Sequence, residues 1–271
     1  MDNQEINLNS GENNVSLSKE KSTFIPGGRA VGAGAATEWI GNAWEMFKAS
    51  SLKWILMTLI YIVILIIAQF MPVLGIFTAL FGPVFVAGFI AASEKQRTTG
   101  DFDIESIFYG FKNKLGSLVA VGALYFGIHL LGFIAAMIVG GASIFQLILS
   151  GQDPDPALLI GSLSTFLLAI VVLYIFIIVA LAFIWFAPAL IIINDLKFGE
   201  AVSMSLSAVR KNLFGGFLFF LLIGILMFVS AIPLLLGLLV TIPMYMITYY
   251  TTYRSIFYTP EEKETKSSLI V

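Results

Sequence analysis

The chain contains no cysteine, and this absence removes several kinds of chemistry at once. Thiolate nucleophiles, disulfides, thiolate metal sites and cysteine-linked lipid anchors all need that side chain. Histidine is nearly absent as well, with 1 residue in 271, and only 12% of the residues are charged. The sequence shows no metal-ligand set, no paired carboxylates and no activated nucleophile. We therefore predict that the protein is not an enzyme, binds no metal and carries no cofactor.

Apolar residues, in contrast, are abundant. They make up 58% of the chain, against roughly 45–50% in soluble domains, and the mean hydropathy is +0.94. The net charge of −2 gives no basic field that would attract nucleic acid. The composition therefore predicts an integral membrane protein that does not bind nucleic acid.

Six apolar stretches are long enough to cross a bilayer, which takes about 20 residues of helix. The fourth stretch is too long for one straight perpendicular helix, so it must tilt, kink or protrude. Pro72 and Pro233 follow the ends of the first and fifth stretches, as helix stop signals do. The predicted spans are 54–71, 73–93, 116–140, 158–190, 213–232 and 234–253.

Basic residues in short loops predict the orientation, because they favour the cytoplasmic side. With these six spans, all 15 Lys and Arg residues fall on one side of the membrane. The loops of the opposite side hold two charges, Asp153 and Asp155. We therefore expect both termini to be cytoplasmic.

Three short amphipathic segments precede the odd-numbered spans, and each ends in basic residues. We predict helices over 37–54, 101–115 and 198–213, with Thr37 and Asp103 as N-caps of the first two. The apolar faces would consist of Trp39, Ile40, Ala43, Trp44 and Phe47; of Ile104, Ile107, Phe108, Phe111 and Leu115; and of Val202, Leu206, Val209 and Leu213.

Prolines recur at corresponding places after these segments, namely Pro83, Pro188 and Pro243 inside the even-numbered spans. We therefore predict an all-α fold of six transmembrane helices in three repeats, each preceded by a cytoplasmic interfacial helix. The repeats would cover 37–97, 101–193 and 197–258, with tails at 1–36, polar and disordered and then Gly/Ala-rich, and at 259–271. The alternative is that basic, mildly amphipathic linkers arise by chance in any membrane protein with cytoplasmic loops.

Basic groups next to apolar helix faces are typical of segments that bind anionic lipid in the headgroup layer. The alternative is that these helices only brace the bundle. The candidate headgroup ligands are Lys48, Lys53, Lys112, Lys114, Arg210 and Lys211.

His129 lies near the middle of the third span, with Tyr125 four residues earlier on the same face. An ionisable group at that depth is a functional candidate, but no charged residue accompanies it in any span. A neutral histidine bonded to a hydroxyl on another helix is the plainer interpretation. Gly132, Ala136 and Gly140 form a small-xxx-small stripe that predicts close helix packing, within the chain or between subunits of a homo-oligomer.

Aromatic residues gather near the predicted cytoplasmic boundary, where an aromatic belt is expected. They are Tyr245, Tyr249, Tyr250, Tyr253, Trp39, Trp44 and Trp54.

The stretch 186–220, "FAPALIIINDLKFGEAVSMSLSAVRKNLFGGFLFF", resembles a pattern of uncharacterised bacterial six-span inner-membrane proteins and of the membrane domain of some glycerophosphoryl diester phosphodiesterases. The stretch 28–47, "GRAVGAGAATEWIGNAWEMF", is similar to the opening of the uncharacterised group. The matching positions are Arg29, Gly34, Trp39, Trp44, Pro188, Ala189, Leu190, Glu200, Ala201, Ser205, Arg210, Lys211 and Asn212. The catalytic domain of the phosphodiesterases has no counterpart here, so the resemblance implies a bacterial inner-membrane location but no enzymatic activity.

Two functions remain open at this point. The first is a non-enzymatic protein of envelope or membrane homeostasis that interacts with anionic phospholipids. The second is a transporter or channel for a lipid-like or small apolar substrate, because repeat-built transporters also have spans broken by prolines.

Overall fold

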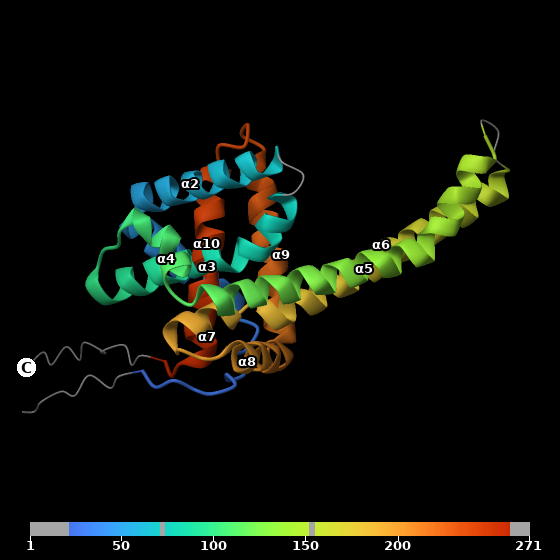
Figure 1. Ribbon diagram of the computed structural model, residues 1–271. Helices are drawn as coiled ribbons and strands as arrows, with labels where there is room; N and C mark the ends of the chain where they lie inside the picture. Colours follow the sequence, from blue (N-terminus) through green and yellow to red (C-terminus); the bar gives the residue numbers. More distant parts are fainter. Residues whose placement is uncertain (1–21, 71–73, 152–154, 261–271) are drawn as a thin grey trace, which may run out of the picture.

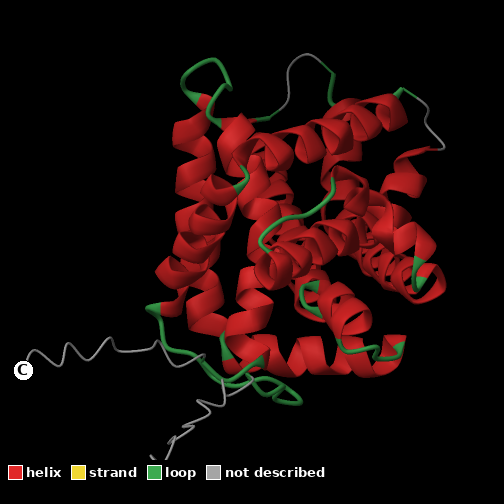
Figure 2. Cartoon of the chain, turned by 90° about the vertical axis from the view of Figure 1, so that its left-hand side faces the viewer, coloured by secondary structure: helices red, strands yellow, loops and turns green. Residues whose placement is uncertain are grey.

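The computed structural model describes residues 22–70, 74–151 and 155–260, and this part of the chain is helical without any β-strand (Figure 2). One isolated antiparallel bridge joins Phe24 to Tyr258. The elements are α1 Ala35–Ala49, α2 Ser51–Gln69, α3 Leu74–Thr99, the 3-10 helix η1 Ile104–Phe108, α4 Tyr109–Lys112, α5 Leu115–Leu149, α6 Pro156–Ile184, α7 Ala187–Ile193, α8 Phe198–Lys211, α9 Leu213–Ala231 and α10 Leu238–Phe257.

Helices cover most of the described residues in the six predicted spans, although α10 begins at Leu238 and not at 234. Within the described residues, four stretches are long and apolar enough to cross a membrane, namely α2, α5, α6 continued into α7, and α9. Only 11% of the most apolar part of α6–α7 is buried inside the protein. Soluble proteins rarely leave so much apolar surface in contact with water, so these faces belong in hydrocarbon. The composition-based prediction of a membrane protein thus agrees with the structure.

The third and fourth predicted spans form a long antiparallel hairpin, α5–α6, that projects away from the rest of the molecule (Figure 1). The span predicted at 116–140 is too short, because α5 continues to Leu149 and contains 35 residues. At 1.5 Å per residue it is about 52 Å long, well over the ~30 Å of a hydrocarbon core. A helix of this length must tilt strongly or extend beyond the bilayer.

Glycines of the small-residue stripe hold this hairpin together. A Cβ added at Gly132 would lie 2.6 Å from Cβ of Phe176, and one added at Gly140 would lie 3.1 Å from Cβ of Ala169. Both partners are on α6. The sequence left open whether the stripe packs within or between subunits, and at these two glycines the contact is within the chain.

The predicted span 158–190 is not one helix. It breaks between Ile184 and Ala187, just before Pro188, whose ring nitrogen has no hydrogen to donate. Ser205 of α8 compensates at the break: its hydroxyl accepts from the amide of Phe186 at 3.2 Å and donates to the carbonyl of Ala182 at 3.1 Å. A residue from another helix therefore satisfies the backbone groups at the break. Pro83 and Pro243 differ from Pro188, because they lie inside α3 and α10 without ending them.

Helix α3 lies in the middle of the molecule, and the backbones of η1, α4 and α5 come very close to one of its faces. A Cβ added at Gly122 of α5 would lie 2.0 Å from the carbonyl oxygen of Leu80. At Gly110 of α4 it would lie 2.4 Å from that of Val84, and at Gly88 of α3 it would lie 2.4 Å from that of Ile107 in η1. The α3 positions 80, 84 and 88 share one helix face. Glycine lets the backbones of η1, α4 and α5 reach α3 there.

The three predicted amphipathic helices differ from expectation in detail. Helix α1 begins at Ala35, and the Thr37 hydroxyl donates to Gly34 instead of capping the helix. Trp39, Ala43 and Phe47 are buried as predicted, but Trp44 is not.

The prediction of one continuous helix over 101–115 is wrong. This segment is the 3-10 helix η1 followed by the single turn α4, and Asp103 makes no capping bond. Lys114, with φ 59°, turns the chain before α5 begins.

In the third segment the buried face of α8 is displaced from the predicted one. It consists of Ala201, Val202, Ser205 and Ala208, whereas Leu213 is exposed. The face is made of small residues because α8 packs closely on the α6–α7 break.

The amphipathic segments pack in a regular order. The segment η1–α4 packs on α3, α8 packs on α6 and α7, and α1 packs on α10. Each segment thus contacts the helices that immediately precede it in the chain, and α1 closes the series by contacting the last helix.

Residues 22–34, which were predicted to belong to the N-terminal tail, pack against α8 and the end of α10. The amides of Ile25 and Arg29 donate to the carbonyls of Phe257 and Ile256 at 2.8 and 2.9 Å. Gly28 has φ +69°, and a Cβ there would lie 2.8 Å from Cγ2 of Ile256. The two ends of the described chain therefore meet, as the lower left of Figure 1 shows.

Candidate headgroup-binding site

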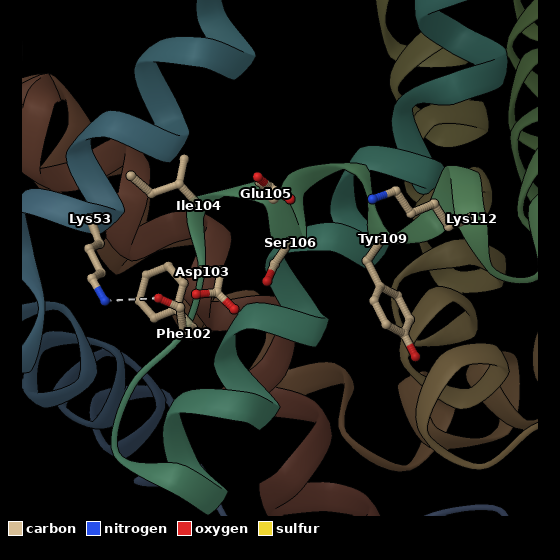
Figure 3. A pocket seen from close by; sticks show the side chains of 8 residues that line it. All are labelled: Lys53, Phe102, Asp103, Ile104, Glu105, Ser106, Tyr109 and Lys112. Atoms are coloured by element: carbon tan, nitrogen blue, oxygen red, sulfur yellow. Dashed lines mark hydrogen bonds between the residues drawn. The ribbon is translucent and has the colours of Figure 1, made fainter.

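A polar hollow lies between the start of α2, the loop that follows α3, and the segments η1 and α4 (Figure 3). Its volume is about 710 Å³, within the range of sites for small molecules. In Figure 3, Lys53 and Lys112 lie at opposite ends of the hollow, with the acidic and hydroxyl side chains between them. It is lined by Lys53, Phe102, Asp103, Ile104, Glu105, Ser106, Tyr109 and Lys112.

Two of the charged side chains in the hollow are already paired. Lys53 donates to both carboxylate oxygens of Asp101, at 2.5 and 2.6 Å, and to the carbonyl of Phe102 at 3.0 Å. The Lys53 ammonium holds the pKa of the Asp101 carboxyl below its usual value. Asp103 pairs with Lys95 of α3. These two pairs hold the loop between α3 and η1 against the start of α2 and the end of α3.

Four other side chains of the hollow have no hydrogen-bond or ion-pair partner in the described part of the chain. They are Glu105, Ser106, Tyr109 and Lys112. Tyr109 and Lys112 are exposed, as is Glu105. The hollow therefore offers one carboxylate, one ammonium and two hydroxyls to a ligand.

Four of the six predicted headgroup ligands have partners inside the protein. Lys48 pairs with Glu45 at 2.9 Å, Lys53 with Asp101, and Lys114 with Asp195. The Lys211 ammonium donates to the carbonyls of Gly27 and Gly28 at 3.0 and 2.8 Å, so it anchors the N-terminal segment. These four are not free cations in this structure.

Lys112 and Arg210 are the remaining two, and both are exposed without a partner among residues 22–70, 74–151 and 155–260. Each lies three residues before a long helix, α5 or α9. Large apolar side chains are exposed beside them: Phe108, Tyr109 and Leu115 near Lys112, and Leu213, Phe214 and Phe217 near Arg210. A cation next to exposed apolar groups suits the boundary between headgroups and acyl chains.

His129 and Tyr125 remain together on α5. Nδ1 of His129 lies 2.9 Å from the backbone carbonyl of Tyr125, and the two ring centroids are 4.0 Å apart. The partner expected from the sequence was a hydroxyl on another helix, whereas the structure gives a carbonyl one turn earlier on the same helix. Within the described residues, no group of three or more His, Cys, Asp or Glu side chains could hold a metal ion.

Two polar networks at the end of α10 were not predicted from the sequence. Tyr250 donates to Glu94 at 2.5 Å and accepts from Nε of Arg97 at 2.7 Å. Tyr253 donates to Oδ1 of Asn194 at 2.5 Å. The aromatic belt is thus wrong for Tyr250 and Tyr253, which are 2% and 0% exposed and join α10 to α3 and to the end of α7.

A signal for these networks was present in the sequence. Glu94 and Arg97 are three residues apart at the end of a span, and the tyrosines recur on the last span at helical spacing. Trp39 and Trp54 are also core residues, with exposed fractions of 2% and 0%.

No protein-family model, curated protein or solved structure matches this chain. The bacterial six-span family named from residues 28–47 and 186–220 therefore stays an expectation. The structure does place parts of these two stretches together. Asn212 accepts from the amide of Val31 at 2.7 Å and donates to the carbonyl of Arg29 at 2.9 Å.

Proposed function

We propose that this is a non-enzymatic membrane protein that holds phospholipid at the polar ends of its helices. The observation that carries the proposal is that Lys112 and Arg210 have no partner among the described residues and that each lies beside exposed apolar side chains. Paired surface cations gain little from a further anion, whereas unpaired ones still offer their full charge. The phosphate of a phospholipid headgroup is the anion that this arrangement fits best.

The proposal includes six spans in three repeats with their polar ends on one side. It is supported by the cyclic packing of α1, η1–α4 and α8 on the preceding helices. It is also supported by Lys48, Lys112 and Arg210, which each lie three residues before α2, α5 or α9. The α9–α10 turn and the far end of α5–α6 point away from the termini in Figure 1.

We assign the polar side to the cytoplasm, because it carries the basic residues. The proposed setting is a bacterial inner membrane, where such a protein would contribute to envelope homeostasis through its bound lipid. Association of several copies is compatible with the exposed α5–α6 hairpin.

The features that suggested transport have structural roles here. Pro83 and Pro243 lie inside continuous helices, and the break at Pro188 is closed by Ser205. The imidazole of His129 is hydrogen-bonded to the backbone carbonyl of Tyr125 on its own helix. We therefore propose lipid binding and not transport.

Replacing both Lys112 and Arg210 with Gln is expected to lower the retention of anionic phospholipid about thirtyfold, because each of the two cations contributes about 1 kcal/mol near an anionic surface. Native mass spectrometry of the detergent-purified protein counts the retained lipids. The control replaces Lys48 and Lys114, which are paired with Glu45 and Asp195 and lie outside the hollow, and should change retention less than twofold. Equal losses in both double variants would contradict the proposal.

A further inference from the structure

The hollow between α2, α3 and η1–α4 differs chemically from the surroundings of Arg210. In the hollow, the groups that have no partner in the part of the chain that the structure describes are the Glu105 carboxylate, the Lys112 ammonium and the hydroxyls of Ser106 and Tyr109. The Glu105 carboxylate would repel a purely anionic ligand. A ligand that carries both an ammonium and a phosphate would satisfy each of the free groups.

We infer that the hollow binds a zwitterionic phospho-amine headgroup, with its phosphate at Lys112 and its ammonium at Glu105. This inference rests on the proposed function and names the ligand class of one of its two cationic positions. Glu105 and Lys112 lie seven residues apart, at the two ends of the short η1–α4 segment. Figure 3 shows both on the upper side of that segment, above Ser106 and Tyr109.

The two paired residues of the hollow hold its walls and do not compete for the ligand. Lys53 is occupied by Asp101 and the carbonyl of Phe102, and Asp103 is occupied by Lys95. With these pairs set aside, one positive and one negative group remain. A neutral zwitterion matches this balance, and a doubly anionic headgroup does not.

A membrane lipid is the source that the surroundings favour over a soluble phospho-amine. Phe108 and Leu115, which flank the η1–α4 segment and the start of α5, are 40% and 38% exposed, and Leu52 beside Lys53 is 69% exposed. These side chains would contact the acyl chains of a lipid whose headgroup lies in the hollow. A soluble headgroup analogue would leave them uncovered and lose that part of the binding energy.

The test compares phosphatidylethanolamine and phosphatidylglycerol, added in equal amounts to the purified full chain and counted by native mass spectrometry. Glu105→Gln is expected to lower phosphatidylethanolamine retention about tenfold and to leave phosphatidylglycerol retention unchanged or higher, because only the ammonium partner is lost. Lys112→Gln should lower both lipids. Glu200→Gln, another exposed acid early in an amphipathic segment, is the matched control and should behave as wild type.

An unchanged ratio of the two lipids in Glu105→Gln would overturn the inference. The proposed function would still stand if the Lys112 and Arg210 double variant lost lipid in the same experiment, so the two failures are distinguishable. Soluble phosphoethanolamine is added in a second arm and is expected not to displace the lipid at equal concentration. If phosphoethanolamine displaces the lipid at equal concentration, the inference that the headgroup belongs to a membrane lipid is wrong.

Discussion

Gly122→Ala should destabilise the protein by roughly 3 kcal/mol, near the upper end of overpacking costs. The added Cβ would lie 2.0 Å from the carbonyl oxygen of Leu80 and 2.6 Å from its carbonyl carbon. Both are backbone atoms of α3, which cannot move independently of the helix. The whole of α5 would have to shift away from the centre of the molecule.

The control is Gly127→Ala on the same helix, where an added Cβ meets nothing within 4 Å. There the substitution should stabilise the helix by about 0.5–1 kcal/mol, because alanine loses less backbone entropy than glycine. Thermal unfolding of both variants in the same detergent measures the difference. Equal and small shifts for the two variants would show that α5 does not approach α3 as described.

Asn212→Ala should release the N-terminal segment from the body of the protein. The buried Asn212 side chain accepts from the amide of Val31 and donates to the carbonyls of Arg29 and Ala208. Its removal leaves a backbone amide without a partner, which costs roughly 1–3 kcal/mol. The cost falls on the local opening of residues 22–34 because two of the three bonds reach that segment.

Trypsin cleavage after Arg29 reports this opening directly. When the segment opens and closes quickly, the cleavage rate follows the open population, so it should rise roughly ten- to hundredfold. Asn113→Ala is the control, since Asn113 is exposed and its amide bonds only the carbonyl of Tyr109. A cleavage rate that is the same in both variants would contradict the anchoring role of Asn212.

The positions of the helices could be predicted from the sequence because long apolar runs have few alternatives in a membrane. Of the three repeat prolines, Pro188 marks the break between α6 and α7, whereas Pro83 and Pro243 lie inside continuous helices. Pro72 and Asp153 lie outside the described residues. Asp155 caps α6 by accepting from the amide of Ala157 at 2.8 Å.

The errors came from contacts that span large sequence distances. The periodicity of 101–115 indicated a helix, but the close approach of Gly110 to α3 and the left-handed Lys114 shape η1–α4 instead. The buried face of α8 is set by how near Ser205 must come to Phe186, which hydrophobic periodicity does not encode. Small residues, which add little to hydropathy, decide the packing at these points.

The candidate site was predicted in part. The sequence predicted six basic residues as headgroup ligands, but the partners of Lys53 and Lys114, which are Asp101 and Asp195, are far away in sequence. Only the folded arrangement distinguishes the unpaired Lys112 and Arg210 from the paired residues. Glu105, Ser106 and Tyr109 were missed because no motif links them before the hollow is formed.

We propose that the polar ends of the three predicted repeats form one face on one side of the membrane. The cysteine-free chain allows a direct test with single substitutions Lys48→Cys, Lys112→Cys, Arg210→Cys and Gly151→Cys. A membrane-impermeant thiol reagent applied to intact cells should label Gly151→Cys alone, and the other three only after the membrane is opened. Labelling of Lys112→Cys or Arg210→Cys in intact cells, alongside Gly151→Cys, would contradict the account.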